Sequence, residues 1–85
     1  MDTQDKENFI SNLDRLHTTE MGAERIKRNL DIKVDDVVLF CRKEIERKDS
    51  DIIRRGKNWY ITVDNRIITV NAHSFTIITA HKEKC

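Results

Sequence analysis

The chain has 85 residues, of which 38% are hydrophobic and 36% charged, so it can bury one small core and leaves no room for a separate catalytic domain. Its formal net charge of +1 excludes the basic excess that binding to a phosphate backbone generally demands. The charge is unevenly distributed: residues 1–50 carry ten Lys or Arg against twelve Asp or Glu, whereas residues 51–85 carry six against three. The second half is therefore the basic half.

Two cysteines, Cys41 and Cys85, lack the closely spaced pairs of small secreted proteins, and we expect both thiols to be free. The first residues, MDTQDKENF, carry acidic side chains where an export signal has basic ones. No segment approaches the roughly 20 apolar residues of a membrane span. We expect one cytoplasmic domain over residues 1–85 that does not interact with membranes.

The first half of the chain is typical of helices. Residues 1–5 are predicted to be disordered and residues 6–49 to form the helical half. Apolar residues at spacings of three and four predict a first helix from Lys6 to His17 with one buried face, made of Phe9, Ile10, Leu13 and Leu16. A second helix follows the N-cap candidates Thr18 and Thr19 and buries Ala23, Ile26 and Leu30. A third, capped by Asp35, buries Val37, Val38, Cys41 and Ile45.

From Ile52 onward the helical period gives way to alternation and β-branched residues become dense, which indicates strands. We predict an antiparallel meander over residues 51–82, with strands near 51–55, 58–63, 66–72 and 75–81. Asp64 and Asn65 both tolerate positive φ, as a two-residue type I′ hairpin requires. This turn sets the register and places Val63 opposite Arg66, Ile61 opposite Ile68, Trp59 opposite Val70 and Tyr60 opposite Thr69.

The predicted fold class is α+β, with two to three N-terminal helices packed on one face of a C-terminal four-stranded antiparallel meander. The face toward the helices is apolar and comprises Trp59, Ile61, Val63, Ile68, Val70, Phe75 and Ile77. His81 shares their alternation phase and is predicted at the edge of this face. The opposite face is mostly polar and uncovered, with Asn58, Tyr60, Thr62, Thr69, Asn71 and Thr76, and with Ile67 and Ile78 as apolar exceptions.

The first and third connections of a meander lie at the same end of the sheet, so a basic turn should approach His73. Cations there would hold a phosphate oxygen while the imidazole, with an ordinary pKa near 6.5, transfers a proton. The candidate catalytic residue is His73, and the candidate binding residues are Arg54, Arg55, Lys57, Asn58, Tyr60, Thr69, Asn71 and Ser74. The competing interpretation is a solvated polar turn with a bystander histidine.

Metal binding and DNA binding have weaker support in the sequence. The histidines and cysteines lack the short paired spacing of zinc sites, so neither a metal site nor a cofactor is predicted. The segment TTEMGAERIKRNLDI followed by DDVVLFCRKEIERK is compatible with a helix-turn-helix that turns Lys27 and Arg28 toward DNA. Acidic residues surround that helix, which favours two core helices with solvated outer faces.

The stretches LHTTEMGAERIKRNL, DVVLFCRKEI and GKNWYITVDNRIITVNAHSFTIITAHK resemble a small bacterial family, the domain of unknown function thirty-seven eighty-one. The resemblance runs from about Leu16 to Lys82. It implies a bacterial intracellular protein and transfers no activity or site residue. The order of helices before a four-stranded meander is similar to barnase-like, colicin-like and RelE-like ribonucleases, which cleave RNA on the open sheet face. This chain departs from them, since its net charge is near zero and no acidic base stands beside His73.

We therefore predict a small module that binds a protein or RNA through the open face of its sheet, without catalysis. Tyr60, Ile67 and Ile78 on that face also suggest a homodimer. The alternatives are a metal-independent ribonuclease that uses His73 with the basic turn, and DNA binding of the helix-turn-helix type.

Overall fold

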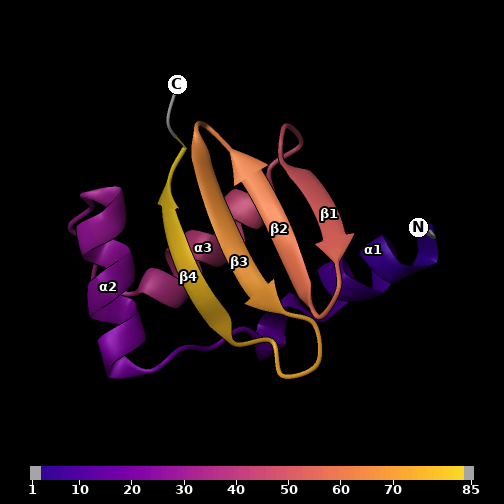
Figure 1. Cartoon of the computed structure of the whole chain (residues 1–85), viewed down its shortest axis with the longest axis horizontal. Helices are drawn as coiled ribbons and strands as arrows, with labels where there is room; N and C mark the ends of the chain where they lie inside the picture. The colour runs from indigo at the N-terminus through magenta and orange to yellow at the C-terminus, as the bar shows by residue number, and fades with distance from the viewer. Residues whose placement is uncertain (1–2, 84–85) are drawn as a thin grey trace.

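The computed structural model of the chain describes residues 3–83. Three α-helices and a short 3-10 helix precede a four-stranded antiparallel sheet in which the strands follow one another in chain order (Figure 1). The helices are α1 (Thr3–Ser11), η1 (Leu13–Arg15), α2 (Glu20–Leu30) and α3 (Val37–Ile45). The strands are β1 (Asp51–Arg55), β2 (Asn58–Val63), β3 (Arg66–Asn71) and β4 (Ile77–Lys82). The predicted α+β fold class is confirmed.

Two tight turns set the register of the first three strands. Asp64 and Asn65 have φ angles of 49° and 61°, as the predicted type I′ turn between β2 and β3 requires. The pairs of β2 with β3 that this turn fixes agree with the prediction from Val63–Arg66 to Trp59–Val70. Between β1 and β2 the two-residue turn places Gly56 at its first central position with a φ of 58°, the pattern of a type II′ turn.

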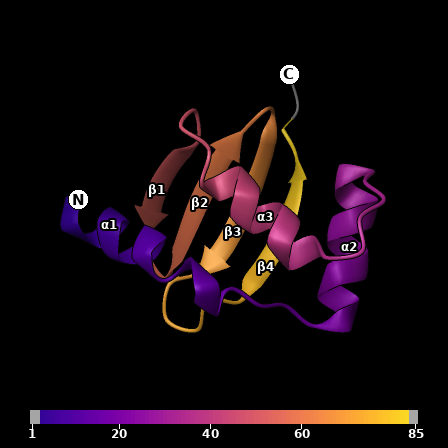
Figure 2. The ribbon, with the colours of Figure 1, turned by 180° about the vertical axis from the view of Figure 1, so that it is seen from behind.

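The helices lie on one side of the sheet and along one of its edges. Figure 2 shows α3 crossing the back of the sheet and α1 behind the end of β1, while α2 stands beside β4. The rings of Phe9 and Trp59 stack with their centroids 4.8 Å apart, which joins α1 to the sheet. All seven residues predicted for the apolar face are buried. No helix of residues 3–83 lies on the other face of the sheet (Figure 1).

The first helix is shorter than predicted. It begins at Thr3, inside the segment expected to be disordered, and it ends at Ser11 rather than His17. The Asn12 side chain donates to the Asn8 carbonyl, and the chain then tightens into η1, which brings Leu13 into the core. Ile10 is 41% exposed and so does not belong to the buried face. The apolar residues keep their spacing of three and four past Ser11, so the sequence pattern alone does not reveal the end of the helix.

The caps of the other two helices follow ordinary chemistry. The Thr19 hydroxyl accepts a hydrogen bond from the Gly22 amide at 3.0 Å, which confirms the predicted N-cap of α2. The cap of α3 is Asp36 rather than the predicted Asp35, because its carboxylate accepts from the Leu39 amide at 3.0 Å. Both caps satisfy amides that the first turn of a helix leaves without partners.

The last strand begins later than predicted and contains a bulge. Phe75 has a φ of 60°, and the strand starts only at Ile77. Val70 pairs with Ile77 whereas Thr69 pairs with Thr79. Ile78 is therefore an extra residue of β4 that has no paired residue on β3, which is a β-bulge.

The bulge overturns the prediction for His81. An extra residue shifts the alternation of the strand by one position, so Ala80 is fully buried against the helices. His81 pairs with Ile67 instead and lies exposed on the uncovered face.

The positive φ of Asn65 yields a test of the hairpin. We expect Asn65→Val to lower the free energy of unfolding by about 1–2 kcal/mol, because a β-branched side chain collides with the backbone in the left-handed region. Asn65→Gly, the matched control, should retain the stability. Urea unfolding followed by the fluorescence of the single tryptophan, Trp59, measures both variants. Equal stabilities of the two variants would contradict the assigned turn.

Candidate functional site

The surface left uncovered by the helices is called the open face below (Figure 1). Strand pairing places twelve side chains on it: Asp51, Ile53, Arg55, Asn58, Tyr60, Thr62, Ile67, Thr69, Asn71, Ile78, Thr79 and His81. Most are uncharged, and three are threonines, whose short branched side chains suit a pleated surface. The open face is therefore a mixed apolar and hydroxyl-bearing surface with charges near its border.

The open face is hollowed beside its first strand. A depression of about 360 Å³ is lined by Ile53, Arg55, Tyr60, Thr62 and Ile67. Apolar carbon atoms from both isoleucines and the tyrosine ring surround it, with hydroxyl groups and one guanidinium available for hydrogen bonds. Such a depression suits a protruding apolar side chain next to a group that accepts hydrogen bonds.

The basic turn and the loop that carries His73 are joined, as the topology predicted. The Ala72 amide donates to the Lys57 carbonyl at 2.8 Å. However, Arg54 lies opposite Trp59, with its guanidinium 5.6 Å from a ring centroid of that residue and its Nε donating to the Gly56 carbonyl. Arg55 projects from the other side of the strand. The two arginines thus lie on opposite sides of the strand and do not converge on one point.

Two of the predicted binding residues shape this loop. The Asn71 side-chain oxygen accepts from the amides of His73 at 2.9 Å and Ser74 at 3.0 Å, which forms an Asx turn. The His73 carbonyl accepts from the Arg15 guanidinium at 3.4 Å, and the imidazole is exposed. The Asn71 side-chain oxygen and the Ser74 hydroxyl therefore make their hydrogen bonds within the loop.

The sequence analysis missed a chain of hydrogen bonds that ends on His17. Ser74 Oγ lies 2.8 Å from Thr76 Oγ1, which lies 3.0 Å from His17 Nε2. The Nδ1 atom of this ring is 2.9 Å from the Arg15 carbonyl. Because a carbonyl only accepts, Nδ1 carries a hydrogen, and Nε2 of the neutral ring accepts from Thr76. The partners are 59 residues apart, so no local pattern announces the contact.

A second polar cluster ties α3 to the β2–β3 turn. The buried carboxylate of Glu44 pairs with Arg66 and, at 3.1 Å, with Arg47. Arg47 also pairs with Asp64, and its hydrogen bond to that carboxylate lowers the pKa of Asp64. Because every charge in this cluster has a partner, we assign it a structural role.

Other chemistries find little support in the part of the chain that the structure describes. Within residues 3–83, no three His, Cys, Asp or Glu side chains are grouped as metal ligands. Among the same residues no helix has the length and hydrophobicity needed to cross a bilayer. Burial, and secondarily the charge of Glu44, raises the pKa of the Cys41 thiol to about 12, so this cysteine is a poor nucleophile.

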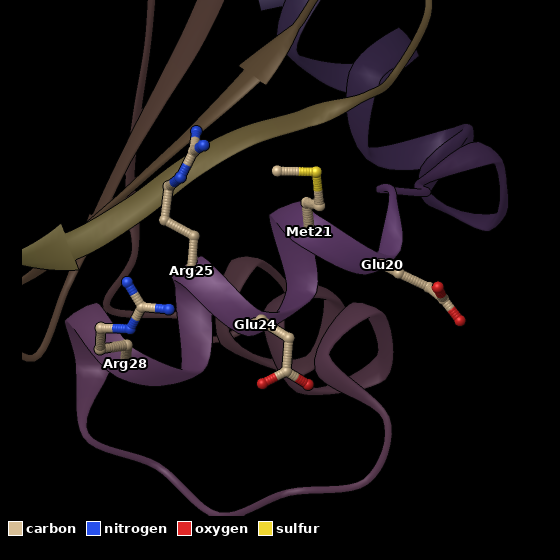
Figure 3. Close-up of a pocket in the computed structure, with 5 residues that line it drawn as sticks. All are labelled: Glu20, Met21, Glu24, Arg25 and Arg28. Carbon is tan, nitrogen blue, oxygen red and sulfur yellow. The ribbon is translucent and has the colours of Figure 1, made fainter.

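The second and third helices do not have the arrangement of a helix-turn-helix. Six residues, 31–36, separate α2 from α3, whereas the motif has a turn of three or four. A hollow of about 390 Å³ lies on the surface of α2. Among the side chains that line it, Arg25 and Arg28 lie toward β4, whereas Glu20 and Glu24 point away from that strand (Figure 3). Lys27, one of the predicted DNA contacts, lies 3.9 Å from Glu24.

Comparison with known proteins identifies a family whose description assigns no activity. A family model described as "Protein of unknown function (DUF3781)" matches residues 10–81. No curated protein and no solved structure matches the chain. The likeness to ribonuclease folds is therefore not confirmed.

The buried thiol yields a second prediction. At pH 8 the thiolate fraction of Cys41 should be about a thousandfold below that of a cysteine with the ordinary pKa of 9.0, before burial restricts access further. In a Cys85→Ser variant, we expect a maleimide reagent to leave the folded chain unlabelled and to label it fully in urea, as intact-mass measurement would show. Equally fast labelling with and without urea would contradict a sealed core around α3.

Proposed function

Because the chain belongs to the DUF3781 family, whose description assigns no activity, we propose a function from the physical character of its surfaces. The domain is a non-catalytic protein-binding module, and the open face of its sheet is the binding surface. The observation that carries this proposal is the one-sided cover of the sheet, since the helices bury the apolar face and leave the other uncovered (Figures 1 and 2).

Apolar side chains on the open face support this proposal. Ile53 and Ile78 are each 41% exposed. Tyr60 and Ile67 lie on the two strands between them and are half-buried. Exposed apolar groups rimmed by polar ones are typical of protein interfaces. A partner that covers them gains the hydrophobic free energy that the folded chain alone leaves unused.

The distribution of charge favours a protein over RNA. The middle of the open face carries Thr62, Ile67 and Thr69, which have no positive charge to attract phosphate, and Thr69 is buried. Its cationic groups lie on the outer strands, where Arg55 shares β1 with the carboxylate of Asp51. An RNA-binding sheet needs a basic groove with exposed aromatic rings, and the single tyrosine here is half-buried.

The hollow indicates the chemistry of the partner. Within residues 3–83, no carboxylate lies within 4.0 Å of the Arg55 side chain, so its guanidinium is available beside the apolar lining. A guanidinium binds a carboxylate in bidentate geometry. The partner surface that fits best presents an apolar side chain next to an Asp or Glu.

Site-directed photo-crosslinking tests the open face in cells that produce the protein. A photoreactive phenylalanine at Tyr60 should capture a discrete protein, because that ring lines the hollow. The same residue at Leu39, which is 44% exposed on α3, is the matched control and should capture nothing comparable. Purified partner should then bind the Ile67→Asp variant at least about tenfold more weakly, since a buried unpaired charge is costly. Capture of RNA at Tyr60, or equal capture at both positions, would overturn the proposal.

A second candidate function is a metal-independent ribonuclease in which His73 transfers the proton and Arg54, Arg55 and Lys57 hold the phosphate. The backbone hydrogen bond from Ala72 to Lys57 favours it, because it holds the basic turn against the His73 loop. The divergence of Arg54 and Arg55 opposes it, since a phosphate group needs donors that converge.

Incubation of the purified chain with total cellular RNA separates the two candidates. We expect no cleavage by the unaltered protein, and therefore identical RNA profiles for it and for His73→Ala. His81→Ala, which removes another exposed histidine, is the matched control. Cleavage that disappears in His73→Ala and persists in His81→Ala would replace the binding module by the enzyme.

A further inference from the structure

The two edges of the sheet differ in their protection. At β4, the Ile77 amide donates to the His17 carbonyl at 2.8 Å, the Thr18 hydroxyl donates to the Ile77 carbonyl at 3.1 Å, and α2 stands alongside. At β1, no backbone hydrogen bond within the described residues 3–83 reaches the outer side of the strand. An unprotected edge strand is a template for another strand. Figure 1 shows β1 as that open edge.

The turn after β1 determines which backbone groups point outward. Arg55 and Asn58 close a two-residue hairpin and therefore exchange hydrogen bonds with each other. Hydrogen-bonded pairs alternate along an antiparallel ladder, so the backbone amide and carbonyl groups of Ile53 and Asp51 also point toward β2. The amide and carbonyl groups of Ile52 and Arg54 are left pointing away from the sheet, two donors and two acceptors in all.

We propose that β1 pairs with β1 of a second copy of this chain, antiparallel and about a two-fold axis at Ile53. Ile52 of each copy then exchanges hydrogen bonds with Arg54 of the other, which uses all the outward groups of both strands. Ile53 meets its own counterpart, where the exposed side chains of the two copies pack together. The same surface serves both copies, as a two-fold interface requires.

Charge selects this register. It sets Asp51 directly opposite Arg55 of the second copy, twice in the dimer, and all four side chains are exposed on the same side of the sheet. A two-fold at Ile52 would leave Asp51 opposite Ile53, and a two-fold at Arg54 would set two arginines against each other. The order Asp-Ile-Ile-Arg-Arg is thus complementary to itself in one register.

The helix side of the same edge carries both apolar and charged groups. A hollow of about 440 Å³ next to β1 is lined by Ile10, Ile45 and Ile52 together with Ser50 and the charged side chains of Lys6, Glu46, Arg47 and Lys48, and Ile10 is 41% exposed. α1 lies behind the sheet at the Arg55 end of β1, and its N-terminal end projects past that strand (Figures 1 and 2), so the two-fold carries the α1 of each copy behind the sheet of the other. The result is one eight-stranded sheet with two open faces side by side, an assembly that goes beyond the proposed function. Arg55 takes part in both proposals, because a guanidinium has five N–H donors and one that pairs with Asp51 of the second copy retains donors for a partner carboxylate on the open face.

Charge reversal tests the register. Asp51→Arg and Arg55→Asp each replace two attractive pairs by two repulsive ones, so each should raise the dimer dissociation constant about tenfold or more. The double variant Asp51→Arg with Arg55→Asp exchanges the charges and should restore the dimer. An equal mixture of the two single variants should also restore it, as a heterodimer. Sedimentation equilibrium over a range of concentrations measures each case, and circular dichroism checks the fold.

The outcomes separate this inference from the proposed function. A strictly monomeric unaltered chain overturns the edge pairing and leaves the open face untouched. A dimer that both single variants retain and Ile67→Asp abolishes also overturns it, because the contact would then be the open face itself. A dimer that the single variants lose and both the double variant and the mixture regain supports pairing through β1.

Discussion

The left-handed backbone at Asp64 and Asn65 is the constraint on which the rest of the structure depends. Side chains alternate between the faces of a sheet, so a slip of one residue in this hairpin would send Trp59 and Ile61 into solvent. The cluster around Glu44 reinforces the same turn from the helix side, since Arg47 joins α3 to Asp64. Local backbone chemistry and long-range ion pairs thus specify one register, the consistency that a single native fold requires.

Features that rest on local chemistry were predictable from the sequence. The pairing of β2 with β3 follows from two residues that tolerate positive φ, and the start of α2 follows from the hydroxyl of Thr19. Both arguments use contacts between residues at most a few positions apart along the chain or placed opposite each other by one turn. The uncovered face follows as well, because alternation along the strands places most of the apolar side chains on the other face.

Features that rest on long-range contacts were not predictable. The bulge at Ile78 accompanies the bridge between His17 and Thr76, which joins segments 59 residues apart and has no local signature. It moved His81 to the open face. The candidate site changed for a similar reason. The topology brought the basic turn to the His73 loop, but the side of the strand on which each arginine lies decided that Arg54 covers Trp59 instead.

The surfaces of the domain share one origin, the asymmetric placement of its helices. α1 and α3 cover one face and α2 stands beside β4, and among residues 3–83 no element covers the open face or the outer side of β1. A small core gains little stability from burial within one chain, and contacts with other chains extend it. Within residues 3–83, the Asn71 side chain hydrogen-bonds to the backbone of the His73 loop, and the Glu44 carboxylate pairs with Arg47 and Arg66. Among the same residues, apolar surface, the outward backbone groups of β1 and the Arg55 guanidinium stay free, and such groups are typical of surfaces that pair with another chain.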